Sequence, residues 1–209
     1  IRTGCPWRDL PSAFGKPNSI FKKFSRWSKD NKLLKIFKLI SSDADLEWVF
    51  IDASHVRAHQ HATGIKDQAI SKSIGGNSSK IHLAVDSHGN PVQFLIEDGT
   101  THDVKVAPKL VNSIDLNETE ILCADKGYDS ESLREQIEKM GTQANIPKKS
   151  NTLSNNDHMD WYLYKIRHLI ENAFARLKQF RGIATRYDKL KRSYENSVAL
   201  ACIFIWLPF

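Results

Sequence analysis

Two short apolar runs, each followed at once by an aspartate, constrain the fold of this chain more than any other feature. The first run is Trp48–Ile51, which leads into Asp52, and the second is Glu120–Ala124, which leads into Asp125. Compact apolar runs of this length are typical of buried strands. The strands come first and then alternate with helical segments, which indicates an α/β fold with a mixed central sheet flanked by helices.

The other elements follow from periodicity and turn residues. Lys80–Asp86 and Pro91–Glu97 alternate like strands around the turn Ser87–Asn90, so we predict a hairpin. Thr63–Ser79 is rich in Gly, Ser, Lys and Asn and is predicted to be an exposed loop, as is the basic stretch Lys148–Asn156. We predict five helices, at Ser19–Ile40, Val104–Asn112, Ser130–Met140, Asp160–Phe180 and Val198–Phe209. Pro108 would suit only the first turn of the second of these helices. Gln143–Ile146 is predicted to be one further short strand.

One polar stripe on the predicted helix Asp160–Phe180 carries chemistry. Tyr164, Arg167, Glu171 and Lys178 have the spacing Tyr-x2-Arg-x3-Glu-x6-Lys. At roughly 100° per helical residue these four side chains fall within about 60° of one another. A carboxylate flanked by two cations can hold a divalent metal while the cations neutralise phosphate, although such a stripe can equally be a solvated face.

The two aspartates after the strands could complete a metal site with Glu171. Ligand sites in α/β sheets lie beyond strand ends, so Asp52 and Asp125 could project into one crevice. Three carboxylates are hard oxygen ligands that suit Mg²⁺ or Mn²⁺, and two such ions can activate a water or a 3′-hydroxyl in phosphodiester chemistry. Taken singly, each aspartate is more often a turn residue or a helix cap.

Composition favours an anionic partner without proving one. Lys and Arg number 30 against 24 Asp and Glu, so the formal net charge is +6. The helix predicted at Ser19–Ile40 is rich in lysine, either as a solvated face or as a phosphate-contacting element. No signal peptide is visible, and the apolar run at the C-terminus is shorter than the roughly 20 residues that span a bilayer. We therefore expect a cytoplasmic, nucleoid-associated protein with no membrane partner.

Taken jointly, these motifs resemble the DDE transposases of bacterial insertion sequences, in the IS-five-like branch. The matching blocks are Arg2–Pro11, Asp52–His59, Lys80–His82, Ala124–Asp129, Arg167–Asn172 and Arg176–Lys189. The Tyr-x2-Arg-x3-Glu-x6-Lys signature of that family is complete in this chain. Because the chain begins at Ile1 rather than Met, we expect a fragment, a processed product or the downstream part of a frameshifted gene.

The resemblance implies an RNase H-like fold and specific site residues. Asp52, Asp125 and Glu171 would be catalytic and would bind two Mg²⁺ or Mn²⁺ ions. The chain would cut DNA at terminal inverted repeats and join the 3′-hydroxyls to target DNA, acting as a dimer or larger assembly in the synaptic complex. The residues expected to contact DNA are Tyr164, Arg167, Lys178, Lys126 and Arg57. Residues 1–44 would form a basic helical segment and residues 45–209 the catalytic domain.

Three other interpretations stay open. His55 and His59 have the His-x3-His spacing of helical zinc ligands, with His61 nearby, which would suit a zinc-dependent hydrolase. No HExxH glutamate lies between them, and Arg57 would crowd a cation. A truncated or inactive remnant that only binds DNA would use the same basic surface. A plain RNase H-like nuclease would cleave strands without joining them.

Overall fold

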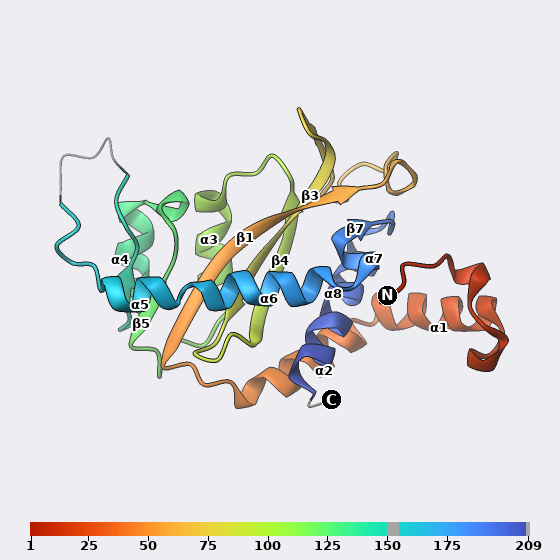
Figure 1. Cartoon of the computed structure of the whole chain (residues 1–209), viewed down its shortest axis with the longest axis horizontal. Helices are drawn as coiled ribbons and strands as arrows, with labels where there is room; N and C mark the ends of the chain where they lie inside the picture. Colours follow the sequence, from red (N-terminus) through yellow and green to blue (C-terminus); the bar gives the residue numbers. More distant parts are fainter. Residues whose placement is uncertain (150–154, 208–209) are drawn as a thin grey trace.

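The computed structural model describes residues 1–149 and 155–207, and it confirms the mixed α/β class (Figure 1). Within these residues the sheet has seven strands: β1 (Trp48–Ala58), β2 (Ser71–Ser73), β3 (Gly76–Val85), β4 (Pro91–Asp98), β5 (Ile121–Cys123), β6 (Gln143–Asn145) and β7 (Thr185–Arg186). The helices are α1 (Pro17–Lys29), α2 (Lys32–Ile40), α3 (Asp103–Val111), α4 (Glu131–Lys139), α5 (Trp161–Ile166), α6 (His168–Lys178), α7 (Arg181–Ala184) and α8 (Lys191–Trp206).

The strand order defines the architecture. Strands β4, β3 and β1 are neighbours and antiparallel, and β5 and then β6 continue the sheet parallel to β1. Three antiparallel strands followed by two parallel ones, in the order β4-β3-β1-β5-β6, is the RNase H-like arrangement that the resemblance implied. The short β2 pairs with the start of β3, and β7 pairs with the end of β1.

Each face of the sheet has its own hydrophobic core, because successive side chains of a strand point to opposite faces. Phe50 and Leu83 belong to a cluster that includes residues of α6 and α8. Val49 and Leu122 belong to a second cluster that includes residues of α3 and α4. Helix α6 crosses in front of β1 in the view of Figure 1, so side chains of that face of β1 meet α6.

The first strand is longer than predicted. We expected it to end before Asp52, but β1 continues to Ala58 and Asp52 lies in its middle. The reason is the antiparallel ladder with β3, which runs unbroken from Phe50↔Val85 to Arg57↔Ser78. The second half of β1 contains polar side chains, so its sequence does not look like that of a buried strand. It is nevertheless a strand, because its backbone pairs with β3 whatever the polarity of its side chains. For the same reason the loop predicted at residues 63–79 is partly wrong, since it contains β2 and the start of β3.

Two predicted helices are each broken into a pair. The stretch predicted at residues 19–40 divides into α1 and α2, because Asn31 adopts a left-handed conformation with φ 53°. The long helix predicted at residues 160–180 divides at Arg167 into α5 and α6. The C-terminal helix begins at Lys191 rather than Val198.

The other local predictions hold, with one exception. Helices α3 and α4, strand β6 and the hairpin of β3 and β4 lie where expected. Pro108, however, lies inside α3 rather than in its first turn. Of the predicted loop at 148–156, residues 150–154 fall outside the described residues.

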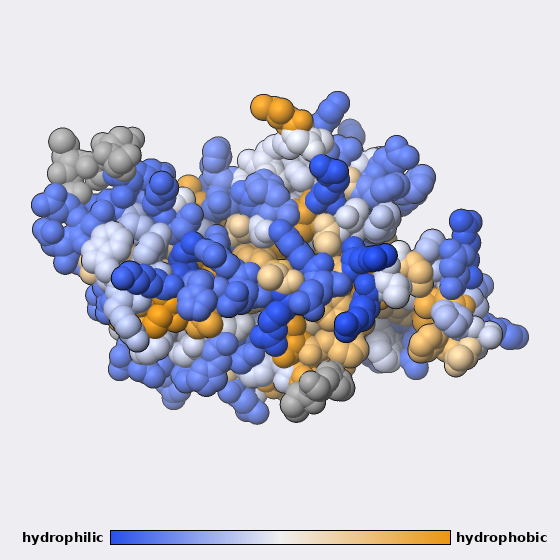
Figure 2. All heavy atoms as spheres, in the orientation of Figure 1, coloured by the Kyte–Doolittle hydropathy of each residue, from blue (hydrophilic) through white to orange (hydrophobic). Residues whose placement is uncertain are grey.

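The N-terminal helices attach to the rest in different ways. Leu33 and Phe37 of α2 are buried in the core cluster that contains α8. Helix α1 extends to one side of the molecule (Figure 1), where Trp7 packs on Phe21 and Phe24. Apolar residues gather on the surface of this arm, whereas the surface over α6 is mainly hydrophilic (Figure 2). In the described part of the chain, no helix is both long and apolar enough to cross a membrane.

Candidate catalytic centre

The two aspartates lie on one face of the sheet. Strands β1 and β5 are parallel with Phe50 opposite Cys123, so Asp52 and Asp125 each stand two residues beyond that pair and share its face. Asp125 caps the short 3-10 turn Lys126–Tyr128, and its Oδ1 accepts a hydrogen bond from the backbone N–H of Gly127 at 2.7 Å. A parallel register therefore brings together two carboxylates that are 73 residues apart in the chain.

Asp52 is the more constrained of the two carboxylates. Burial raises the pKa of its carboxyl above the usual value, and the nearby charge of Asp125 adds to the rise. A hydrogen bond from the Ala53 backbone N–H to Oδ1 and the charge of Arg167 act in the opposite direction. Because Asp52 is half-buried and lies beside a second carboxylate, a nearby cation is required to stabilise its charged form.

Arg167 supplies that cation. Its Nη1 donates to Asp52 Oδ2 at 2.8 Å, and its Nη2 donates to Glu171 Oε1 at 2.7 Å. Burial acts to lower the pKa of this guanidinium, but the two carboxylates outweigh it and raise the pKa above its usual value. The position of Arg167 at the break between α5 and α6 lets it reach β1 while remaining one helical turn from Glu171.

The predicted DNA-contacting side chains divide between two places. Tyr164 lies beside the centre, with the Arg167 guanidinium 5.8 Å from its ring centroid, and Lys178 Nζ donates to Ser54 Oγ at 2.6 Å. Lys126 is exposed on the turn that follows Asp125. Arg57 is exposed, but it lies five positions after Asp52 in an unbroken ladder and so points to the opposite face of the sheet. A DNA contact by Arg57 stays a prediction that the strand geometry does not connect to the carboxylates.

Two residues next to the centre escaped the sequence reasoning. Ser54 shares the face of Asp52 and fixes the ammonium of Lys178. Gly127 lets its backbone approach Asp125, because a Cβ at this position would lie 2.8 Å from Oδ1. The period-2 rule along a longer β1 would have found Ser54, and the Asp-Lys-Gly turn would have suggested Gly127.

A buried polar cluster lies on the other face of β1 and β3. His82, opposite Ala53, is fully buried, and burial lowers its pKa to about 4, so its imidazole is neutral at pH 7. Lys80 donates to Asp103 at 2.8 Å, and the carboxylate of Asp103 lies 3.8 Å from His82. This cluster ties α3 to the sheet behind the carboxylates.

The donor set suits a hard divalent cation. In residues 1–149 and 155–207, no group of three or more His, Cys, Asp or Glu side chains is arranged to hold a metal ion. The geometry gives the reason, since the guanidinium of Arg167 lies between Asp52 and Glu171. The three carboxylates offer the oxygen chemistry that Mg²⁺ and Mn²⁺ prefer.

The helical premise of the zinc alternative is wrong. His55 lies in the strand β1, and His59 precedes the 3-10 turn Gln60–Ala62. Residues four apart in a strand are separated by roughly 13 Å, which is too far for one ion. His59 instead packs against His61 and stacks on Tyr187, with ring centroids 4.8 and 4.9 Å away.

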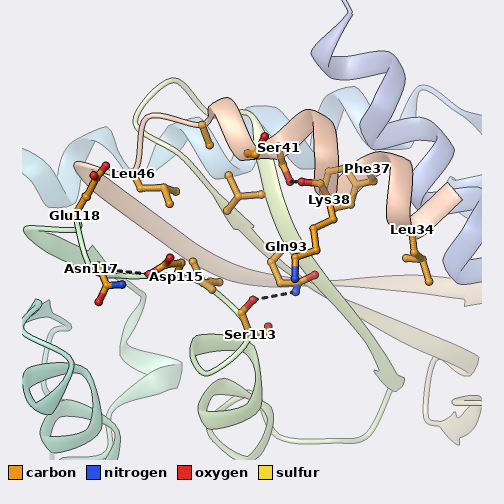
Figure 3. Close-up of a pocket in the computed structure, with 14 residues that line it drawn as sticks. Leu34, Phe37, Lys38, Ser41, Leu46, Gln93, Ser113, Asp115, Asn117 and Glu118 are labelled. Atoms are coloured by element: carbon orange, nitrogen blue, oxygen red, sulfur yellow. Dashed lines mark hydrogen bonds between the residues drawn. The ribbon is translucent and has the colours of Figure 1, made fainter. Parts of the chain in front are cut away.

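A concave pocket of about 600 Å³ lies elsewhere, between α2, β4 and the loop after α3 (Figure 3). Its walls combine Phe37 and Val92 with Lys38, Asp115 and Glu118. It shares no residue with the carboxylate centre. Pockets are the usual place to look for small-molecule sites, but the three carboxylates do not line this one.

The fold and the three carboxylates place this chain in the class of RNase H-like proteins with an acidic centre. Comparison with known proteins identifies a family within this class. Residues 44–206 match the family model described as "Transposase DDE domain", and residues 1–37 match "Putative transposase of IS4/5 family". A putative transposase for insertion sequence element IS6501 from Brucella ovis is 36% identical over 131 residues, which cover 62% of this chain and 98% of that protein.

The solved structures that this chain matches are distant in sequence. The piggyBac transposase in a synaptic complex with hairpin DNA has a TM-score of 0.49 and 10% identity, covering 78% of this chain and 46% of that one. The catalytic domain of Mos1 mariner transposase has a TM-score of 0.35 and 10% identity, with 90% of each chain covered. This chain thus spans nearly all of the Brucella relative but less than half of the piggyBac chain.

The chain belongs to the DDE transposases of bacterial insertion sequences. The function of this family is transposition, in which the enzyme cleaves DNA and transfers the cut strands, and its members generally use a divalent metal ion.

Proposed function

We propose that this chain cuts DNA at the terminal inverted repeats of an insertion sequence and joins the freed 3′-hydroxyls to target DNA. The carboxylates of Asp52, Asp125 and Glu171 form the catalytic centre in this proposal. Support comes from one observation above all. A single guanidinium connects Asp52 on β1 with Glu171 on α6, while Asp125 faces the same side of the sheet.

Each residue has a defined task. Two Mg²⁺ or Mn²⁺ ions, held by the three carboxylates, would activate the attacking hydroxyl and stabilise the leaving oxygen. Asp125 is oriented by the N–H of Gly127, and Asp52 by the N–H of Ala53. Lys178 and Arg167 carry the positive charge that phosphate groups require. Water and then a DNA hydroxyl serve as nucleophiles, so no covalent bond to the protein forms.

Partners and organisation follow from the same proposal. DNA is the partner, and the basic net charge of the chain favours its approach. Joining two ends requires that two copies meet, so the working assembly is at least a dimer. Residues 1–44 act as a basic helical segment that contacts DNA, and residues 45–209 carry the chemistry.

An excision assay in cells tests the proposal. A marker flanked by the native ends of the element is supplied with this chain, and loss of the marker from its original site is measured by amplification across the junction. Excision is the expected result. Binding to the terminal repeats without any excision would instead favour a remnant that only binds DNA, and cutting without joining to a target would favour a plain nuclease.

Lys178→Ala should weaken DNA binding without abolishing cleavage. The ammonium of Lys178 is exposed and its hydrogen bond goes to Ser54, so it is available to a phosphate. Loss of one phosphate contact should reduce affinity about 10-fold at low salt and lower the slope of log K against log salt by about 0.9. Fluorescence anisotropy of a labelled duplex at several salt concentrations measures both quantities. Lys139→Ala, on α4 and paired with Glu135, is the matched control and should bind like the wild type; an unchanged slope for Lys178→Ala would remove this contact from the proposal.

A further inference from the structure

Arg167 occupies one oxygen atom on each of two carboxylates that a metal ion would need. Asp52 Oδ2 and Glu171 Oε1 each accept one of its N–H groups, and Asp52 Oδ1 is engaged by the backbone of Ala53. The guanidinium side chain is mostly buried, with 17% of it exposed. A divalent ion held between Asp52 and Glu171 would lie beside this guanidinium and be repelled by its charge, so metal binding favours displacement of Arg167.

Displacement needs a new partner for the guanidinium. Releasing a mostly buried cation from two carboxylates is unfavourable unless another anion receives it. A DNA phosphate offers the same bidentate oxygen geometry as a carboxylate. Tyr164 would extend the surface that DNA contacts, because the centroid of its ring lies 5.8 Å from the Arg167 guanidinium. Two of its five N–H groups go to Asp52 and Glu171, and a phosphate that binds the guanidinium competes with these carboxylates for its positive charge.

We propose that Arg167 is an internal cation that keeps the metal site closed until DNA binds, so that DNA and divalent metal bind cooperatively. This inference rests on the proposed role of Asp52, Asp125 and Glu171 as metal ligands. In the free protein the guanidinium neutralises Asp52 and Glu171 and competes with the ion. When a phosphate takes Arg167, the carboxylates are left with unbalanced negative charge, and the ion binds more tightly. By linkage, the ion strengthens DNA binding by the same factor.

Such coupling would tie metal loading to DNA binding. Coupling of roughly 10-fold or more, within the usual range for linked sites, would restrict loading to the DNA-bound protein.

Mn²⁺ titration of the full chain tests the inference, with calorimetry as the readout and no turnover required. The expected result for the wild type is weak Mn²⁺ binding alone and binding about 10-fold tighter when the protein is saturated with a short duplex of arbitrary sequence, after subtraction of Mn²⁺ binding to the duplex. Arg167→Gln should bind Mn²⁺ about 10-fold tighter than the wild type without DNA and lose most of the further gain from DNA. Arg167→Lys, which keeps the charge but replaces the forked guanidinium with one compact ammonium, should fall between the two.

Two further variants separate the possible failures. Lys165→Gln removes the same charge from an exposed neighbouring position and should behave like the wild type, which excludes a general effect of net charge. Asp52→Asn should lose Mn²⁺ binding. If Asp52→Asn binds Mn²⁺ like the wild type, the metal-site proposal itself fails. If Asp52→Asn loses binding but Arg167→Gln gains none, or if DNA leaves wild-type affinity unchanged, only the role of Arg167 as the closing cation is overturned.

Discussion

Asp52→Asn is expected to reduce DNA strand cleavage by at least about 10³-fold, a loss of roughly 4 kcal/mol of transition-state stabilisation. The substitution removes the negative charge nearest the centre of the site but preserves the size of the side chain. The amide oxygen can still accept a hydrogen bond from Ala53 N–H or from Arg167, so the local structure has no reason to collapse. Folding stability and duplex affinity should therefore stay close to those of the wild type.

The measurement compares cleavage of a labelled terminal-repeat duplex at saturating Mg²⁺ with thermal unfolding of the same preparations. Asp43→Asn is the matched control, because Asp43 is exposed on the 3-10 turn after α2 and has the same chemical change. The control should cleave at the wild-type rate. Retention of more than about a tenth of the activity by Asp52→Asn would exclude this carboxylate from the catalytic centre.

The parts of the fold that depend on local patterns were predictable from the sequence. The apolar start of β1 and the run at β5 are buried because their residues fill the two cores directly, as Phe50 does on one face and Val49 and Leu122 do on the other. The hairpin of β3 and β4 follows from the alternation on both sides of a turn that contains Gly89. In each of these elements the residues that specify the structure lie within the element itself.

Elements decided by distant partners were not predictable. The second half of β1 is polar, and its conformation is fixed by pairing with β3 rather than by its own residues. The break at Asn31 depends on one left-handed residue, for which a single Asn gives only a weak signal. The break at Arg167 coincides with a hydrogen bond to Asp52, which is 115 residues away in the sequence.

At the candidate centre, too, some features were predictable from the sequence and others were not. Spacing along the helix was enough to group Arg167 with Glu171, and the position of each aspartate after a strand suggested a shared edge. The spacing could not show that Arg167 neutralises the carboxylates in the free protein, because that contact depends on how α6 packs against β1. The family resemblance also placed Arg57 among the DNA-contacting residues, whereas strand parity directs the side chains of Arg57 and Asp52 to opposite faces.

Gly127→Ala should reduce the rate of first-strand cleavage by about 10²-fold without unfolding the protein. A Cβ at this position would lie 2.8 Å from Asp125 Oδ1, closer than real Cβ contacts, and 3.6 Å from Cγ and Oδ2. The backbone of Gly127 does not have a positive φ, so alanine is acceptable to the main chain and the strain is directed at the carboxylate. The hydrogen bond from Gly127 N–H must lengthen or break, and Asp125 must rotate. Displacement of a reacting group by a fraction of an ångström to one ångström is enough for a loss of this size.

The cause of the loss can be separated from a loss of structure. A displaced ligand weakens metal binding, so raising the Mn²⁺ concentration should restore part of the activity of Gly127→Ala, whereas a misfolded protein would not respond. Gly75→Ala is the matched control, because its Cβ would meet only Ser73 Oγ at 3.8 Å, an ordinary contact, and its cleavage should be unchanged. Wild-type cleavage by Gly127→Ala would mean that the orientation of Asp125 in the free protein is not the one used in the reaction. Loss that Mn²⁺ cannot relieve, with an unchanged unfolding temperature, would instead indicate that the turn Lys126–Tyr128 acts on the DNA rather than on the carboxylate.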